Sequence, residues 1–133
     1  MASIFTKIIN GEIPCYKIAE DEHCFAFLDI NPLARGHTLV IPRKEVDYLF
    51  DLDDDLTVRL HLFAKKVARA IDSVMDCKRV GVAVLGLEVP HAHIHLIPIN
   101  NLYDIEFSRP KLNLSREEFE ETAEKIRKAY QGS

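Results

Sequence analysis

The sequence predicts an α+β domain with about five mostly antiparallel strands and two substantial helices. Short apolar runs separated by turn residues occur early in the chain and again after residue 79, a pattern typical of strands. Two longer segments carry apolar residues at steps of three and four, which is typical of amphipathic helices. Because no repeat or linker interrupts these patterns, we expect one domain over residues 1–133.

The chain begins with a predicted short helix. Ser3 can cap a helix that runs to about Asn10, and Gly11 can adopt the left-handed conformation that ends it. Residues 16–19 and 24–28 then favour two short strands joined by a polar turn. We expect these two strands to form a hairpin.

The remaining elements follow from the same patterns. Residues 37–42 predict a strand, and residues 53–75 predict one long amphipathic helix. Residues 80–85 and 90–98 are apolar enough to be central strands, and a capping box opens a final helix at residues 115–130. In the strand predicted at residues 37–42, one face is expected to carry His37, Leu39 and Ile41. Residues 99 to 114 show no pattern that places them.

Composition narrows the class of partners. The formal net charge is −4 with a pI near 5.8, and Lys and Arg form no stripe that could follow a nucleic-acid backbone, so no polynucleotide partner is expected. The N-terminus lacks the apolar run of a signal peptide, and no later run approaches the roughly 20 apolar residues that span a membrane. We therefore expect a cytoplasmic protein with no membrane partner. Three scattered cysteines indicate reduced thiols and no structural zinc cluster.

The stretch PHAHIHLIP, residues 90–98, carries the strongest chemical signal. Its histidines alternate, so in a strand their side chains share one face while Ile94 and Leu96 share the other. Burying three imidazoles for packing alone costs roughly 1–3 kcal/mol for each ring nitrogen left without a partner. A functional role is therefore favoured for this triplet, whereas His23 and His61 are expected to be structural or solvated.

Metal binding and phosphoryl chemistry both use imidazole. In an unbent strand the Cα atoms of the first and third histidines lie about 13 Å apart, so the three side chains do not easily reach one ion. Phosphoryl chemistry suits the row better, because a neutral ring can attack phosphorus while its neighbours donate hydrogen bonds to phosphate oxygens. Metal binding through His91, His93 and His37 stays open as an alternative.

Three segments resemble one known family. HAHIHLIP resembles the His-x-His-x-His-x-x motif of the histidine-triad (HIT) nucleotide-binding superfamily. SIFTKIINGEIP and FLDINPLARGHTLVIPRK precede it in the order seen in the Hint-like branch, and the likeness covers roughly residues 3 to 98. The resemblance implies a five-stranded antiparallel sheet, usually dimerised into one continuous ten-stranded sheet. It also implies hydrolysis or transfer at the α-phosphate of a nucleotide. For this chain we expect no cofactor and no metal.

The resemblance also assigns roles to particular residues. By it, His93 looks like the nucleophile that forms a nucleotidyl-imidazole intermediate, His95 contacts the phosphate, and the backbone carbonyl of His91 holds the His93 ring. His37 matches a fourth active-site histidine. Asp29 matches a carboxylate that binds the ribose hydroxyls, a role that its acceptor oxygens suit. The apolar residues expected around the base are Phe5, Ile13, Phe27, Ile30 and Leu39.

Two groups of positions depart from the family pattern. Some members bind zinc through Cys-x-x-Cys and two histidines, but this chain has Ser3, Thr6 and Glu45 where three of those ligands stand. The loop before the histidines is also short, with Leu87 where glutamine is usual and Glu88 where some relatives have serine or threonine. A carboxylate near an anionic phosphate is unfavourable unless it is protonated, turned away or hydrogen-bonded.

The leading hypothesis is therefore a hydrolase that acts on a nucleoside phosphoramidate or related nucleotide conjugate through His93. Its partners are expected to be a purine nucleotide or nucleotide conjugate and a second copy of the chain. The alternatives are a nucleotide-binding regulatory module with little turnover and the histidine-based metal-binding protein.

Overall fold

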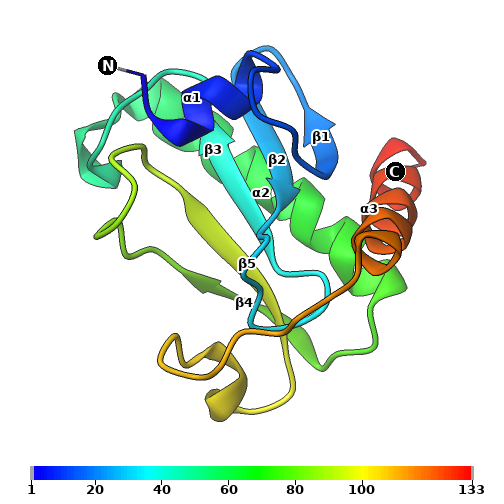
Figure 1. Cartoon of the computed structure of the whole chain (residues 1–133). Coiled ribbons are helices and arrows are strands. Elements are labelled where there is room, and N and C mark those ends of the chain that lie inside the picture. The colour runs from blue at the N-terminus through cyan, green and yellow to red at the C-terminus, as the bar shows by residue number, and fades with distance from the viewer. Residues whose placement is uncertain (1, 133) are drawn as a thin grey trace.

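A computed structural model describes residues 2–132 and shows one five-stranded antiparallel sheet with three α-helices, as the sequence predicts. The strand order is β1-β2-β3-β5-β4 (Figure 1). The helices are α1 (Ile4–Ile9), α2 (Asp54–Val74) and α3 (Arg116–Gln131), with two short 3-10 helices, η1 (Leu49–Asp51) and η2 (Leu102–Ile105). The strands are β1 (Lys17–Glu20), β2 (Cys24–Leu28), β3 (Thr38–Pro42), β4 (Arg79–Ala83) and β5 (Ile94–Ile99).

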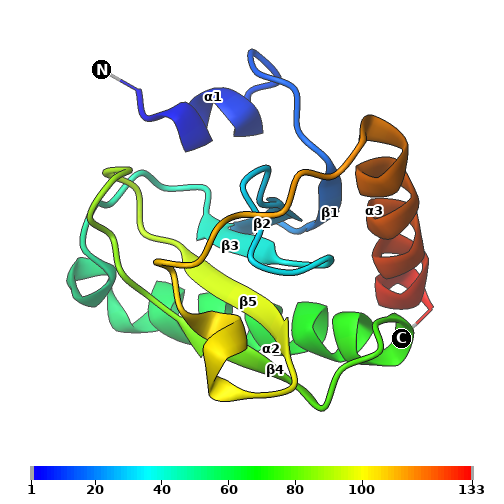
Figure 2. The ribbon, with the colours of Figure 1, turned by 60° about the horizontal axis from the view of Figure 1, so that its bottom comes forward.

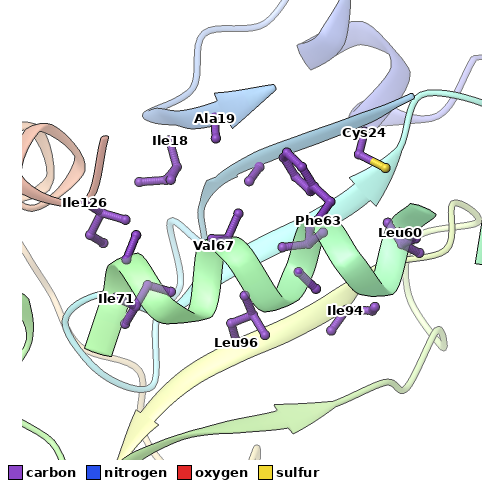
Figure 3. Close-up of a cluster of buried hydrophobic side chains, with 14 of the residues drawn as sticks. Ile18, Ala19, Cys24, Leu60, Phe63, Val67, Ile71, Ile94, Leu96 and Ile126 are labelled. Atoms are coloured by element: carbon purple, nitrogen blue, oxygen red, sulfur yellow. The ribbon is translucent and has the colours of Figure 1, made fainter. Parts of the chain in front are cut away.

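The helix α2 covers one face of the sheet, and α1 lies on the opposite side (Figure 2). The apolar stripe of α2 faces the strands, and its residues Leu60, Val67 and Ile71 are fully buried (Figure 3). From the sheet, Ile94 and Leu96 of β5 join the same cluster. This arrangement confirms the predicted long amphipathic helix, and it leaves the other face of β3 and β5 available for a site.

The predicted ends of the helices are confirmed by their hydrogen bonds. The hydroxyl of Ser3 accepts from the N–H of Thr6, and Gly11 has a φ of 79° just after α1. At α3, the side chain of Ser115 accepts from the N–H of Glu118, and the Glu118 carboxylate accepts from the N–H of Ser115. These reciprocal bonds form the capping box expected from the sequence.

Two predictions about the strands need correction. Residues 80–85 do not form a central strand, because β4 pairs only with β5 and lies at the edge of the sheet, where Val82 is 63% exposed. The strand β5 begins at Ile94, so His91 and His93 precede it and only His95 lies within it. The predicted directions of the side chains are nonetheless confirmed, since Ile94 and Leu96 pack toward α2 while the imidazoles lie on the opposite face.

The segment that the sequence left unplaced contains η2 and a stretch we call the strap, residues 106–115. The strap runs from η2 to the start of α3, across the face of the sheet away from α2 (Figure 2). It is tied to the loop after β2, because the N–H of Leu112 donates to the carbonyl of Pro32 at 2.9 Å.

Within residues 2–132, no helix has the length and apolar character needed to cross a membrane.

The surroundings of Gly36 leave little room for a side chain. Gly36 has a φ of 97°, and an added Cβ would lie 3.0 Å from the Met75 sulfur and 3.2 Å from a Pro98 carbon. We expect Gly36→Ala to lower the free energy of unfolding by about 2–4 kcal/mol, from backbone strain and overpacking together. Gly11→Ala is the matched control, because Gly11 is also left-handed but has open space around it. Its loss should be about 1 kcal/mol, from strain alone. Urea unfolding measures both, and equal losses would contradict the close packing at Gly36.

Candidate active site

A cavity of about 360 Å³ opens on the face of the sheet away from α2. Its walls come from α1, the end of β2, the short loop before β5 and the strap. Eight of the ten residues expected at the site line it: Phe5, Ile13, Phe27, Asp29, Ile30, Leu39, His93 and His95. The other two, His91 and His37, are buried and hold the rings that do line it.

The apolar wall of the cavity is built by α1 and the facing strands. Phe27 and Leu39 are partners across β2 and β3, and both are nearly buried. The ring of Phe5 packs edge-on against Phe27 at 5.5 Å and against His93 at 5.1 Å between ring centroids. Ile30 lines the cavity from a loop and is 65% exposed. Its exposure at a cavity mouth suits contact with a ligand.

The ring of His93 is fixed by a backbone carbonyl. Its Nδ1 lies 2.8 Å from the carbonyl oxygen of His91. Because a carbonyl can only accept, Nδ1 carries the proton and the neutral ring keeps its lone pair on Nε2. This contact is the one that the family resemblance implies for His91.

His91 is itself held at both ring nitrogens. Its Nε2 lies 2.7 Å from the carbonyl of Pro42, so Nε2–H donates there. Its Nδ1 lies 2.8 Å from the hydroxyl of Ser3, which then donates to it. Burial lowers the pKa of His91, which favours this neutral form. The N-terminus of α1 and the end of β3 therefore both orient the residue that orients His93.

The positions of the family's zinc ligands hold a hydrogen-bonded cluster instead. The Glu45 carboxylate accepts from the N–H of Ser3 at 2.6 Å and from the hydroxyl of Thr6 at 2.7 Å. These bonds, first that of Ser3, lower the pKa of Glu45 to about 2. The Thr6 hydroxyl lies 3.4 Å from Nδ1 of His91. Hydrogen bonds between hydroxyl, carboxylate and imidazole thus join α1 to the loop after β3.

A second pair of imidazoles forms a directed chain. The N–H of Leu33 donates to Nδ1 of His37 at 3.0 Å, so a neutral His37 carries its proton on Nε2. That Nε2 lies 2.9 Å from Nδ1 of His95, which must accept, so His95 presents an N–H at its own Nε2. Burial is the main cause that lowers the pKa of His37 to about 3 and that of His95 to about 4. Both rings are therefore neutral near pH 7.

Asp29 combines a turn role with a place in the cavity wall. Its Oδ1 accepts from the N–H of Asn31 at 2.8 Å, and its Oδ2 lies 3.5 Å from Nε2 of His37. Burial raises its pKa, while the Asn31 bond and the nearby His93 and Lys111 act in the opposite direction. One oxygen of Asp29 thus stabilises the turn while the side chain still lines the cavity.

In the histidine set hypothesised for a metal, His91 offers no free ligand atom, because its two ring nitrogens are engaged by Ser3 and Pro42. Within residues 2–132 a different set is close, since ligand atoms of Asp29, His37 and His95 lie within 4.8 Å of one another. An ion there would have to displace the proton that Nε2 of His37 donates to Nδ1 of His95. The remaining histidines are ordinary: His61 is exposed and bonds the carbonyl of Thr57, and His23 lies in a turn.

Sequence reasoning missed two residues that the strap contributes. The ring of Phe107 lies edge-on to His95, with centroids 4.8 Å apart, and Lys111 lines the cavity. The only sequence signal for them was negative, a segment with charged and aromatic residues but no periodicity. Such a segment is placed by contacts with loops, which a periodic pattern does not report.

Comparison with known proteins identifies the family. The HIT domain family model matches residues 10–102. An uncharacterised HIT-like protein of Borreliella burgdorferi is 40% identical over 131 residues, covering 92% of this chain and 94% of the relative. The adenosine 5′-monophosphoramidase hnt1 of Schizosaccharomyces pombe is 35% identical, covering 95% of this chain and 96% of the relative.

A solved structure agrees. The crystal structure of a HIT-like protein involved in cell-cycle regulation from Bartonella henselae matches with a TM-score of 0.82 and 35% identity. The match covers 96% of this chain and 95% of that one. The chain belongs to the HIT domain family.

The buried imidazoles make stability depend on pH. In the unfolded chain a histidine titrates near 6.5, whereas in the folded chain His37 and His95 titrate at about 3 and about 4. Between pH 6.5 and 4 the unfolded state therefore binds more protons, and the free energy of unfolding falls as the pH falls. Each group contributes up to roughly 1.4 kcal/mol per pH unit. We expect His37→Asn to reduce this slope in urea unfolding from pH 7 to 5, and the exposed control His61→Asn to leave it unchanged. A wild-type slope equal to that of His37→Asn would contradict the buried neutral pair.

Proposed function

We propose that this protein is a nucleotide hydrolase that cleaves a nucleoside phosphoramidate or related conjugate at the α-phosphorus. The observation that carries the proposal is the hydrogen bond from Nδ1–H of His93 to the carbonyl of His91, which leaves a lone pair on Nε2 of a residue that lines the cavity. A neutral imidazole with a free, oriented nitrogen is a competent nucleophile toward phosphorus. The kinship with a named adenosine 5′-monophosphoramidase supports the choice of substrate class.

The reaction proceeds in two displacements. Nε2 of His93 attacks the α-phosphorus, a nitrogen–phosphorus bond forms, and the bond to the amine leaving group breaks. The His93 ring becomes cationic, and the carbonyl of His91 stabilises it through Nδ1–H. The amine takes up a proton from solvent as it leaves. Water then attacks the same phosphorus and gives up a proton to solvent. The bond between phosphorus and Nε2 breaks, which releases the nucleoside monophosphate and restores the neutral ring.

The second imidazole pair supplies a donor rather than a base. Because Nδ1 of His95 accepts from His37, the N–H at Nε2 of His95 can donate to a phosphoryl oxygen or to the departing group. The pKa values of about 3 and about 4 keep both rings neutral, so the donor does not need to lose or gain a proton to bind phosphate. His95 and His93 therefore have opposite roles, one donating and the other attacking.

The nucleoside is proposed to lie along the apolar wall. Asp29 offers acceptor oxygens at the cavity for ribose hydroxyls, and Phe5, Phe27 and Leu39 provide flat apolar surface for a base. Ile13 and Ile30 close the outer side. The purine preference expected from the family resemblance stays a prediction, as does the cytoplasmic location.

The second candidate is a nucleotide-binding regulatory module with little turnover. It is favoured by the loop before β5, where Leu87 and Glu88 line the cavity in the place of residues that donate to phosphate in relatives. Glu88 is exposed, so its charge faces any phosphate at the mouth. Turnover separates the two candidates directly.

We also propose that two copies join through β4. This strand is an edge of the sheet, and Val82, Val84 and Leu85 on and after it are exposed apolar residues. An apolar edge with unpaired backbone groups favours pairing with another strand. The continuous ten-stranded sheet implied by the family resemblance would cover this edge.

The central experiment is turnover of adenosine 5′-phosphoramidate. We expect AMP release without added metal and in the presence of a chelator, and a loss of about 10³-fold or more in His93→Ala, because the nucleophile is gone. The exposed His61→Ala is the matched control and should keep full activity. An acid-labile AMP adduct should map to His93 by mass spectrometry.

Three results would count against parts of this proposal. An adduct on any other residue would contradict the assignment of the nucleophile. Loss of activity with chelator would contradict the metal-free mechanism. AMP binding without turnover in the wild type would select the regulatory module.

A further inference from the structure

The strap lies outside the part of the chain that the family model matches. That match ends at residue 102, whereas the strap comprises residues 106–115. Phe107 nevertheless packs edge-on to His95 and, at 6.2 Å between centroids, to His37. The bond from Leu112 N–H to the Pro32 carbonyl fixes the far side of the strap against the loop after β2. The family model therefore does not include the strap, although Phe107 of the strap contacts two of the imidazoles.

The charges that line the cavity are unfavourable for an anion without the strap. Asp29 and Glu88 are both carboxylates, and the short loop offers the apolar Leu87 beside them. In the described part of the chain, Lys111 is the one Lys or Arg residue among those that line the cavity. A phosphate placed there meets two like charges, and a single cation near it offsets that repulsion.

Lys111 is held in place by the strap itself. Its ammonium donates to the carbonyl of Phe107 and, at 3.2 Å, to the carbonyl of Arg109. An ammonium has three N–H groups, so one is left to donate to a ligand. Its charge reaches the site, because Lys111 lowers the pKa of both Asp29 and His37. Two hydrogen bonds thus hold the exposed Lys111 ammonium on the strap, at a cavity that His93 and His95 also line.

We propose that Lys111 is the phosphate-binding cation of this site, delivered by the strap in place of the donors that the short loop lacks. It recognises the charged phosphoryl group of a nucleotide, while Phe107 covers His95 and keeps its donor in a less hydrated environment. The protein consequently prefers a nucleotide with an anionic phosphoryl group over the corresponding nucleoside. The inference rests on the proposed function only in requiring that a nucleotide occupies the cavity.

Calorimetric binding of AMP and of adenosine tests this role without turnover. We expect Lys111→Ala to weaken AMP binding about tenfold, as for loss of a hydrogen bond to a charged group, and to leave adenosine binding unchanged. Lys111→Arg keeps the charge and should recover most of the affinity for AMP. Lys125→Ala, an exposed lysine on α3, is the matched control and should bind like the wild type. Glu88→Gln removes a like charge and should tighten AMP binding several-fold.

The outcomes distinguish this inference from the proposed function. If the wild type binds AMP and hydrolyses the phosphoramidate while Lys111→Ala binds AMP equally tightly, the inference alone is wrong. Equal losses for AMP and adenosine would show that Lys111 only supports the strap, which also contradicts it. An AMP-specific loss in a protein that never hydrolyses substrate supports the inference and contradicts the hydrolase. Absence of AMP binding in the wild type contradicts both.

Discussion

The hydrogen bond from Nδ1–H of His93 to the carbonyl of His91 is the constraint on which the rest of the site depends. It selects one of the two tautomers of His93 and turns the lone pair of Nε2 outward. The carbonyl can do this because the His91 ring is fixed by Pro42 and Ser3, which belong to the end of β3 and the cap of α1. Backbone geometry thus fixes which nitrogen of the neutral ring is free to attack.

The sheet separates the residues that stabilise the fold from those that form the site. On β5, Ile94 and Leu96 pack under α2, whereas His95 points to the other face and pairs across the ladder with Leu39. Large apolar residues on one face supply burial free energy, so the other face can hold buried imidazoles that need partners. Each imidazole finds those partners in backbone groups, in the hydroxyl of Ser3 or in another imidazole.

Periodicity predicted the helices and the strand facing well, because burial on one side leaves a regular trace in the sequence. It failed where backbone pairing matters: His91 and His93 precede β5, and β4 is an edge strand despite its apolar run. The motif residues of the cavity were named through the family resemblance. The resemblance also implied the tautomer of His93. The tautomers of His91, His37 and His95 were not predictable, because they depend on the carbonyl of Pro42 and on the N–H of Leu33. Phe107 and Lys111 were missed because the apolar residues of the strap have no regular spacing.

The most direct test of this account is the protonation pattern of the imidazoles, measured by long-range ¹H–¹⁵N correlation NMR at pH 7 with His→Gln variants for assignment. We expect His93 to carry a proton on Nδ1 and a lone pair on Nε2, whereas His37, His91 and His95 are neutral and protonated on Nε2. A His93 ring protonated on Nε2, or a charged His95, would contradict it, because the nucleophile would then lack its lone pair or the donor chain would be broken.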